Sequence, residues 1–215
     1  QENDFSGWNG DTEEKYDLIL TLIRDLMRHK NSEPVLKAFL GLVKTSGLDV
    51  LMDDHCKDEF LPVLGTHHQH PKVASLIEKI FADPGSPWAL SKTDYADANS
   101  LGNHNLVQAP AFRKALRLAI ADQSIVGSLR IEEDDNDYCW IDWKNDSSSG
   151  QGVGKPLGVK PGGPAMDLRF CDALLAGLNN AVFNQNRGPE IRLYWPLKNR
   201  EASRQKWLEY LDRKN

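Results

Sequence analysis

The sequence predicts a mainly α-helical protein made of antiparallel helix hairpins, with a β-hairpin inserted in its second half. Apolar residues recur every three or four positions along residues 11–82, 110–120 and 168–211, as on one face of a helix. Between residues 126 and 143 they alternate instead, which is typical of strands. With 215 residues, 40% of them apolar, the chain can bury a core as a single domain spanning residues 1–215.

The first two predicted helices form a hairpin near the N-terminus. The first begins near Thr12 and ends near Lys30, with one continuous apolar face. The second begins around Pro34, because proline is favoured in the first helical turn, and Gly47 ends it. Since the link between them is short, we expect the two helices to pack antiparallel.

A second hairpin is predicted to complete residues 11–82. A weaker apolar pattern runs from Leu48 to Leu64, and another helix begins at Pro71. Pro34 and Pro71 stand 37 residues apart, close to the period of about 40 residues found in HEAT and armadillo units. Residues 83–109 are rich in Gly, Pro, Ser, Asp and Asn, which predicts a long connection.

Residues 110–215 are predicted to hold three further helices around the inserted β-hairpin at about 126–143. Pro110 begins the first of these helices, Asp167 is predicted to cap the second and Asn199 the third. A Gly/Ser/Pro-rich loop at residues 145–164 follows the hairpin. Trp195 and Trp207 are predicted to belong to the core.

Two motifs near the C-terminus carry a family resemblance. Residues 168–179 read LRFCDALLAGLN, and residues 200–207, after Trp195, read REASRQKW. They resemble the closing segment of bacterial HEAT-repeat-type (armadillo-like) α-solenoid proteins, in which an Arg-x-Cys-Asp-x-Ala-like helix is followed by a Trp-ending helix. The resemblance implies a helical scaffold and, because the family is functionally diverse, no particular reaction.

Charge and hydropathy limit the partners. The chain has 26 Lys and Arg residues against 31 Asp and Glu residues, a net charge of −5, which argues against binding to nucleic acid. No segment is apolar for the roughly 20 residues that a membrane helix needs, so we expect a soluble protein without membrane insertion. Charge leaves a protein partner, a small ligand or a substrate open, and of these we expect another protein. Because the chain begins at Gln1, export after removal of a signal peptide stays open, as does the oligomeric state.

The β-hairpin is predicted to present a binding surface. Its residues are Glu132, Glu133, Asp134, Asp135, Asp137, Tyr138 and Trp140. Carboxylates attract a cationic partner, and exposed aromatic side chains anchor interfaces. The same carboxylates could hold calcium, although their spacing is not that of an EF-hand, or they could simply form a solvated turn beside aromatic residues that pack on the core.

A histidine-rich segment before Pro71 offers a different chemistry. His67, His68 and His70 follow His55 and Cys56, and imidazole and thiolate are the usual ligands of zinc. The spacing matches no established zinc motif, so a solvated loop between two helices is the alternative. We therefore expect no cofactor, with zinc or calcium as the metal if one is bound.

Nothing in the sequence predicts a catalytic residue. Cys56, Cys139 and Cys171 lie far apart, which permits at most one disulfide without saying which pair forms it. Cys171 stands on an apolar helical face, as a buried and inert thiol would. The sequence therefore predicts a non-catalytic protein-interaction module. The alternatives are a metal-dependent hydrolase using the histidine-rich loop and an inhibitor or immunity-type protein that binds a basic partner.

Overall fold

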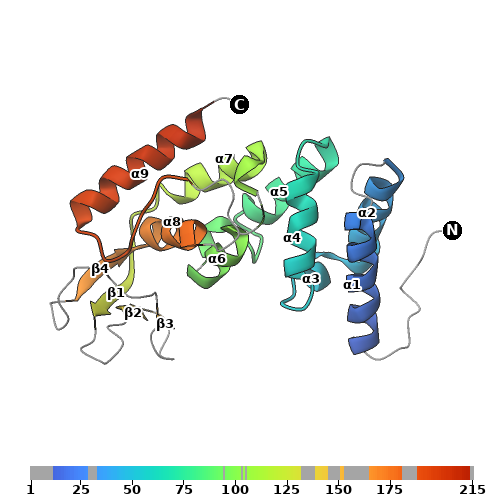
Figure 1. The fold of residues 1–215 in the computed structure, drawn as a ribbon, viewed down its shortest axis with the longest axis horizontal. Helices are drawn as coiled ribbons and strands as arrows, with labels where there is room; N and C mark the ends of the chain where they lie inside the picture. Colours follow the sequence, from blue (N-terminus) through green and yellow to red (C-terminus); the bar gives the residue numbers. More distant parts are fainter. Residues whose placement is uncertain are drawn as a thin grey trace.

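The computed structural model describes residues 12–28, 33–93, 95–102, 104, 106–131, 139–144, 151–152, 165–180 and 188–213. Within these residues the protein is mainly helical, with a small antiparallel sheet at the end of the molecule opposite α1 and α2 (Figure 1). The predicted fold class is confirmed at this level, while the HEAT-like stacking of its helices stays a prediction. Among the described helices, none is long and apolar enough to cross a membrane.

Five helices form the N-terminal part. They are α1 (Thr12–Arg28), α2 (Glu33–Ser46), α3 (Leu48–Leu51), α4 (Lys57–Thr66) and α5 (Pro71–Phe81). Helix α1 packs against both α2 and α4, and Ile19 and Ile23 of α1 are fully buried there. Phe39 of α2 stacks on Phe60 of α4 with 5.6 Å between the ring centroids. As predicted, Gly47 ends α2, because its φ of 78° lies in the left-handed region that favours glycine.

The next part of the chain contains a helix that the sequence does not predict. Within residues 83–109 lie the 3₁₀ turns η2 (Leu90–Lys92) and η3 (Leu106–Gln108) and the helix α6 (Tyr95–Gly102). Helix α6 packs along α8 (Phe170–Asn180), where Ala98 and Leu101 are buried. Because α6 has only eight residues, packing rather than intrinsic propensity stabilises it. Helix α7 (Pro110–Ala119) follows and packs on α5.

The sheet has four antiparallel strands in the order β3-β2-β1-β4. Strands β1 (Ile125–Ile131) and β2 (Cys139–Trp143) confirm the predicted hairpin, and β3 (Gln151–Gly152) and β4 (Met166–Arg169) extend it. Leu129 and Ile141 face each other across β1 and β2 and are buried. Position 127 requires glycine, because a Cβ on Gly127 would lie 2.4 Å from the carbonyl oxygen of Asp142.

Two predicted helix starts are wrong. Asp167 does not cap a helix, because it lies in β4 opposite Ser128, and α8 begins only at Phe170. The strand runs directly into the helix, so the apolar pattern shows no break between them. The last helix, α9 (Leu197–Asp212), is preceded by Pro196 at its N-cap, before the predicted Asn199. Trp207 is fully buried as predicted, whereas Trp195 is only half-buried.

Candidate functional site

The predicted binding surface on the hairpin lies largely beyond what the structure describes. Glu132, Glu133, Asp134, Asp135, Asp137 and Tyr138 are outside the described residues. Trp140 lies in β2, where its backbone position is opposite Arg130 of β1 and Gly152 of β3. A contact between this hairpin and a partner therefore stays a prediction.

The three predicted metal ligands lie together in the turn between α4 and α5. His68 Nδ1 is 2.8 Å from the carbonyl oxygen of Gly65, and His70 Nδ1 accepts a hydrogen bond from the backbone of Lys72 at 3.3 Å as the N-cap of α5. Two of the three rings thus already have a structural partner. Over the described part of the chain, no three His, Cys, Asp or Glu side chains come together in a way that could hold a metal ion. The zinc hypothesis remains untested.

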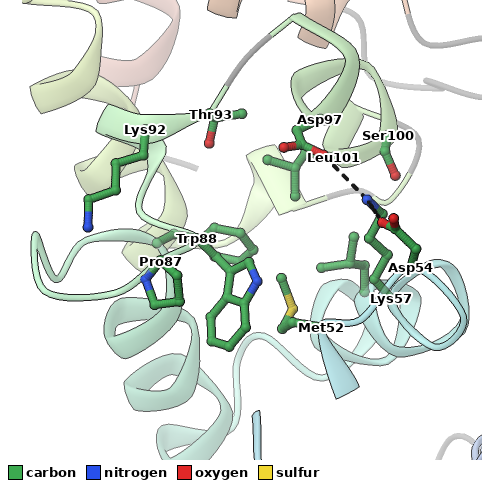
Figure 2. A pocket seen from close by; sticks show the side chains of 12 residues that line it. Met52, Asp54, Lys57, Pro87, Trp88, Lys92, Thr93, Asp97, Ser100 and Leu101 are labelled. Atoms are coloured by element: carbon green, nitrogen blue, oxygen red, sulfur yellow. Dashed lines mark hydrogen bonds and ion pairs between the residues drawn. The ribbon is translucent and has the colours of Figure 1, made fainter. Parts of the chain in front are cut away.

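The structure brings together a pocket that no segment of the sequence displays by itself. It lies where α3 and α4 meet the segment that leads into α6 (Figure 2), and we call it the junction pocket. Its volume is about 190 Å³. Its lining residues are Met52, Asp54, Lys57, Leu61, Phe81, Pro87, Trp88, Lys92, Thr93, Asp97, Ser100 and Leu101. Buried apolar side chains and Trp88 form its floor, and charged side chains form its rim.

Local turns place Trp88 in this pocket. The side chain of Asp83 accepts a hydrogen bond from the backbone of Gly85 at 2.8 Å, and Ser86 Oγ accepts one from the backbone of Trp88 at 3.2 Å. Asp and Ser favour turns because their side chains bond the backbone two residues further along. The turn-rich segment after α5 therefore holds a half-buried indole ring in a fixed position beside Met52.

One wall of the junction pocket carries an ion-pair network. Lys57 Nζ lies 2.6 Å from Asp54 and 3.3 Å from Asp97, which joins α4 to α6. Burial lowers the pKa of Lys57, but the hydrogen bonds to these two carboxylates outweigh it, so the pKa lies above its ordinary value. Both carboxylates are well exposed, at 86% for Asp54 and 57% for Asp97, and they can meet a further cation from solvent.

A third carboxylate continues this wall. Asp58 accepts a hydrogen bond from Ser100 Oγ at 3.0 Å and lies 4.0 Å from His104 Nε2. Burial holds the pKa of His104 below its ordinary value although Asp58 and Glu59 oppose that shift, so the imidazole is neutral at pH 7. Asp58 therefore adds a negative charge that His104 does not balance. We call Asp54, Asp58 and Asp97 the acidic wall.

Lys92 stands on the other side of the pocket. Its Nζ donates a hydrogen bond to the carbonyl oxygen of Ser86 at 2.8 Å, which holds the ammonium group beside Pro87. Figure 2 shows Lys92 and the pair of Lys57 and Asp97 on opposite sides of Trp88 and Leu101. The rim is therefore polarised, with carboxylates concentrated on the side of α4 and α6.

A second charged cluster is buried between α8 and α9. Asp172 is fully buried and accepts hydrogen bonds from Arg169 Nε and Nη2 at 2.9 and 2.8 Å. Arg200 binds the same carboxylate through Nη1 and donates to the backbone carbonyls of Trp195 and Asp167. Both oxygens of Asp172 therefore accept a hydrogen bond from a guanidinium group, and one carboxylate links two arginines.

Glu201 extends the cluster to the surface of α9. It accepts hydrogen bonds from Arg204, from Arg169 and from Gln205, and the contact with Arg204 is the main reason that the pKa of Glu201 falls to about 2. The cluster ties β4, α8 and α9 together, which is a structural role. Its five charged members all lie in the two C-terminal motifs that carry the family resemblance.

No protein-family model, curated protein or solved structure matches this chain. Function is therefore inferred from the geometry of the junction pocket, which sequence reasoning missed. Its two halves, around Met52 and Trp88, are distant in sequence, and contact between them is a property of the fold. Two features of the sequence could have indicated this pocket: the acidic run DDHCKDE at residues 53–59 and a tryptophan in a turn-rich segment.

The buried cysteines give a first testable prediction. Cys56 and Cys171 are free and fully buried, and burial raises their pKa values to about 11 and about 12. Since the thiolate is the reactive form, neither should react with a thiol reagent in the native protein at pH 8. We expect the Cys139→Ser variant to release no colour with Ellman's reagent until denaturant is added, and then two equivalents. Rapid native reaction would contradict this burial.

Proposed function

We propose that this protein is a non-catalytic helical interaction module that binds a basic protein partner at the junction of α4 and α6. The observation that supports this proposal is the acidic wall beside an apolar pocket. Asp54 and Asp97 line the pocket and are 86% and 57% exposed. Asp58 is 71% exposed and accepts a hydrogen bond from the lining residue Ser100. Exposed carboxylates steer a basic partner into contact, and a pocket with an apolar floor can receive an anchoring side chain.

The helical framework supports the same proposal. Residues 52–61, from the turn before α4 and from α4 itself, contribute one side of the junction pocket and residues 87–101 the other, so two segments distant in sequence shape one surface. Ion pairs and hydrogen bonds across α4 and α6 hold that surface in a fixed form, which lowers the conformational entropy lost on binding. The acidic hairpin predicted at residues 126–143 is a second proposed contact for a partner of the same charge.

Affinity capture with the full chain tests this function. The bait is compared with a double variant, Asp54→Lys with Asp58→Lys, that reverses two exposed charges of the acidic wall. We expect a basic partner that the original chain retains to lose about tenfold or more in affinity for the variant, at about 1 kcal/mol for each exposed charge. Raising the salt concentration should weaken the same complex.

The matched control places two reversed charges elsewhere. Asp17→Lys with Asp25→Lys changes the net charge equally on exposed positions of α1, outside the junction pocket. This control should retain the partner. If both double variants lose it equally, net charge rather than the acidic wall determines binding. If neither loses it, the partner binds somewhere else and the proposed function of this surface is wrong.

A further inference from the structure

We infer that the junction pocket receives one apolar side chain, of about the size of a single aromatic ring, from a basic segment of the partner. This inference rests on the proposed function and adds the chemistry of the inserted residue. The inserted residue of the partner is phenylalanine, or an aliphatic residue of similar volume, and lysine or arginine flanks it. Three properties of the junction pocket support this inference: its volume, the apolar side chains of its floor and the charges at its rim.

The volume sets the size of the inserted group. The pocket has about 190 Å³, and an apolar cavity of about 150 Å³ is known to bind benzene. A single ring therefore fits. Leu61, Phe81 and Leu101 are almost completely buried, so the protein interior already excludes water from the bottom of the pocket.

The floor suits an apolar and aromatic guest. Figure 2 shows the indole of Trp88 and the side chain of Met52 side by side, with Leu101 across the recess from them. An aromatic guest against Trp88 gains ring-to-ring contact in addition to the buried area. A methionine adapts its shape to the guest, because its side chain is unbranched and its sulfur polarisable.

The rim sets the charge of the residues that flank this guest. The pocket lining holds two carboxylates, Asp54 and Asp97, and two lysines, Lys57 and Lys92. Asp58 lies next to the lining, where it accepts a hydrogen bond from Ser100, and adds a third carboxylate on the side of Asp54 and Asp97. A lysine or arginine beside the inserted residue meets Asp54, the most exposed of the three, at small desolvation cost. An acidic flank would meet repulsion there. Lys92, on the far side, is held against the carbonyl oxygen of Ser86.

Three capped peptides separate the contribution of the ring from that of the charge. The probes are acetyl-Lys-Phe-Lys-amide, acetyl-Lys-Ala-Lys-amide and acetyl-Glu-Phe-Glu-amide, each titrated into the ¹⁵N-labelled full chain. Binding is followed by the indole resonance of Trp88 and, in every variant, by the backbone amide resonance of Leu101, which lines the same pocket. We expect the Lys-Phe-Lys peptide to bind about tenfold more tightly than the Lys-Ala-Lys peptide, because one ring anchor is lost. It should bind at least about threefold more tightly than the Glu-Phe-Glu peptide.

Two variants place this binding in the pocket. Trp88→Ala should abolish the preference for phenylalanine over alanine, and Asp54→Asn should reduce the affinity for Lys-Phe-Lys by about threefold. The matched control is Asp25→Asn, which removes another exposed, ion-paired aspartate, on α1 and outside the junction pocket, and should leave the affinity unchanged. Comparison of the three peptides on the unaltered chain keeps the test decisive even if Trp88→Ala lowers stability.

The possible outcomes separate this inference from the proposed function. Equal binding of the Phe and Ala peptides overturns the apolar anchor, while loss of a captured partner from the Asp54→Lys and Asp58→Lys variant would still support the proposed function. Equal binding of the Lys-Phe-Lys and Glu-Phe-Glu peptides overturns the requirement for a basic flank. In the remaining case, the peptides differ in affinity as expected while the captured partner binds the Asp54→Lys and Asp58→Lys variant as tightly as the original chain. The pocket then binds the peptides as inferred, and the proposed function is wrong.

Discussion

Replacing Asp172 with asparagine is expected to lower the free energy of unfolding by about 3–5 kcal/mol. The fully buried carboxylate holds Arg169 through two hydrogen bonds and Arg200 through a third contact. Asparagine has almost the same volume, so it leaves no cavity. It does remove the negative charge, and both guanidinium groups, which are 8% and 3% exposed, then stay buried without that counterion. Urea unfolding monitored by circular dichroism measures the loss.

The matched control is Asp167→Asn, five residues earlier in the same segment. Asp167 is exposed, and only its backbone carbonyl contacts Arg200, so the substitution should change the free energy of unfolding by less than about 0.5 kcal/mol. Equal effects of the two substitutions would show that the buried cluster does not hold α8 and α9 together. A large effect of Asp172→Asn alone would confirm that it does.

Helices whose apolar spacing is local could be predicted from the sequence. The start of α1 at Thr12, the start of α5 at Pro71 and the end of α2 at Gly47 all depend on residues within a few positions. The β-hairpin was predicted for the same reason, since its alternation is visible in the sequence. Helix α6 was not, because its own composition favours turns and its stability comes from α8, far away along the chain.

The candidate site depends on contacts that local patterns do not contain. Lys57 and Asp97 are 40 positions apart, and sequence reasoning instead favoured charges that cluster in the chain, such as residues 132–137. Likewise, the two C-terminal motifs contain Arg169, Asp172 and Arg200, but the ion pair between Asp172 and Arg200 forms only when α9 packs against α8. The sequence predicts a helix at the position of strand β4, because Leu168 suits either periodicity.

Replacing Gly188 with alanine is expected to lower the free energy of unfolding by about 3 kcal/mol, at the upper end of the cost of overpacking a core. A Cβ at this position would lie 2.1 Å from Cη2 of Trp207, and the two next nearest atoms belong to the same ring. Because Trp207 is fully buried and packs edge-on against Tyr210, its ring cannot move without disturbing α9. Urea unfolding followed by tryptophan fluorescence measures this loss.

Gly41→Ala is the matched control, because it adds the same methyl group where space is open. Apart from the chain neighbours of Gly41 and the backbone of its own helix α2, no atom lies within 4 Å of a Cβ at this position. Alanine should therefore raise the free energy of unfolding by about 0.5–1 kcal/mol. The two alanine substitutions should therefore act with opposite signs. Combining Gly188→Ala with Trp207→Leu should cost less than the sum of the single changes, because the shorter side chain relieves the clash. Strict additivity would show that the clash with Trp207 is not the cause.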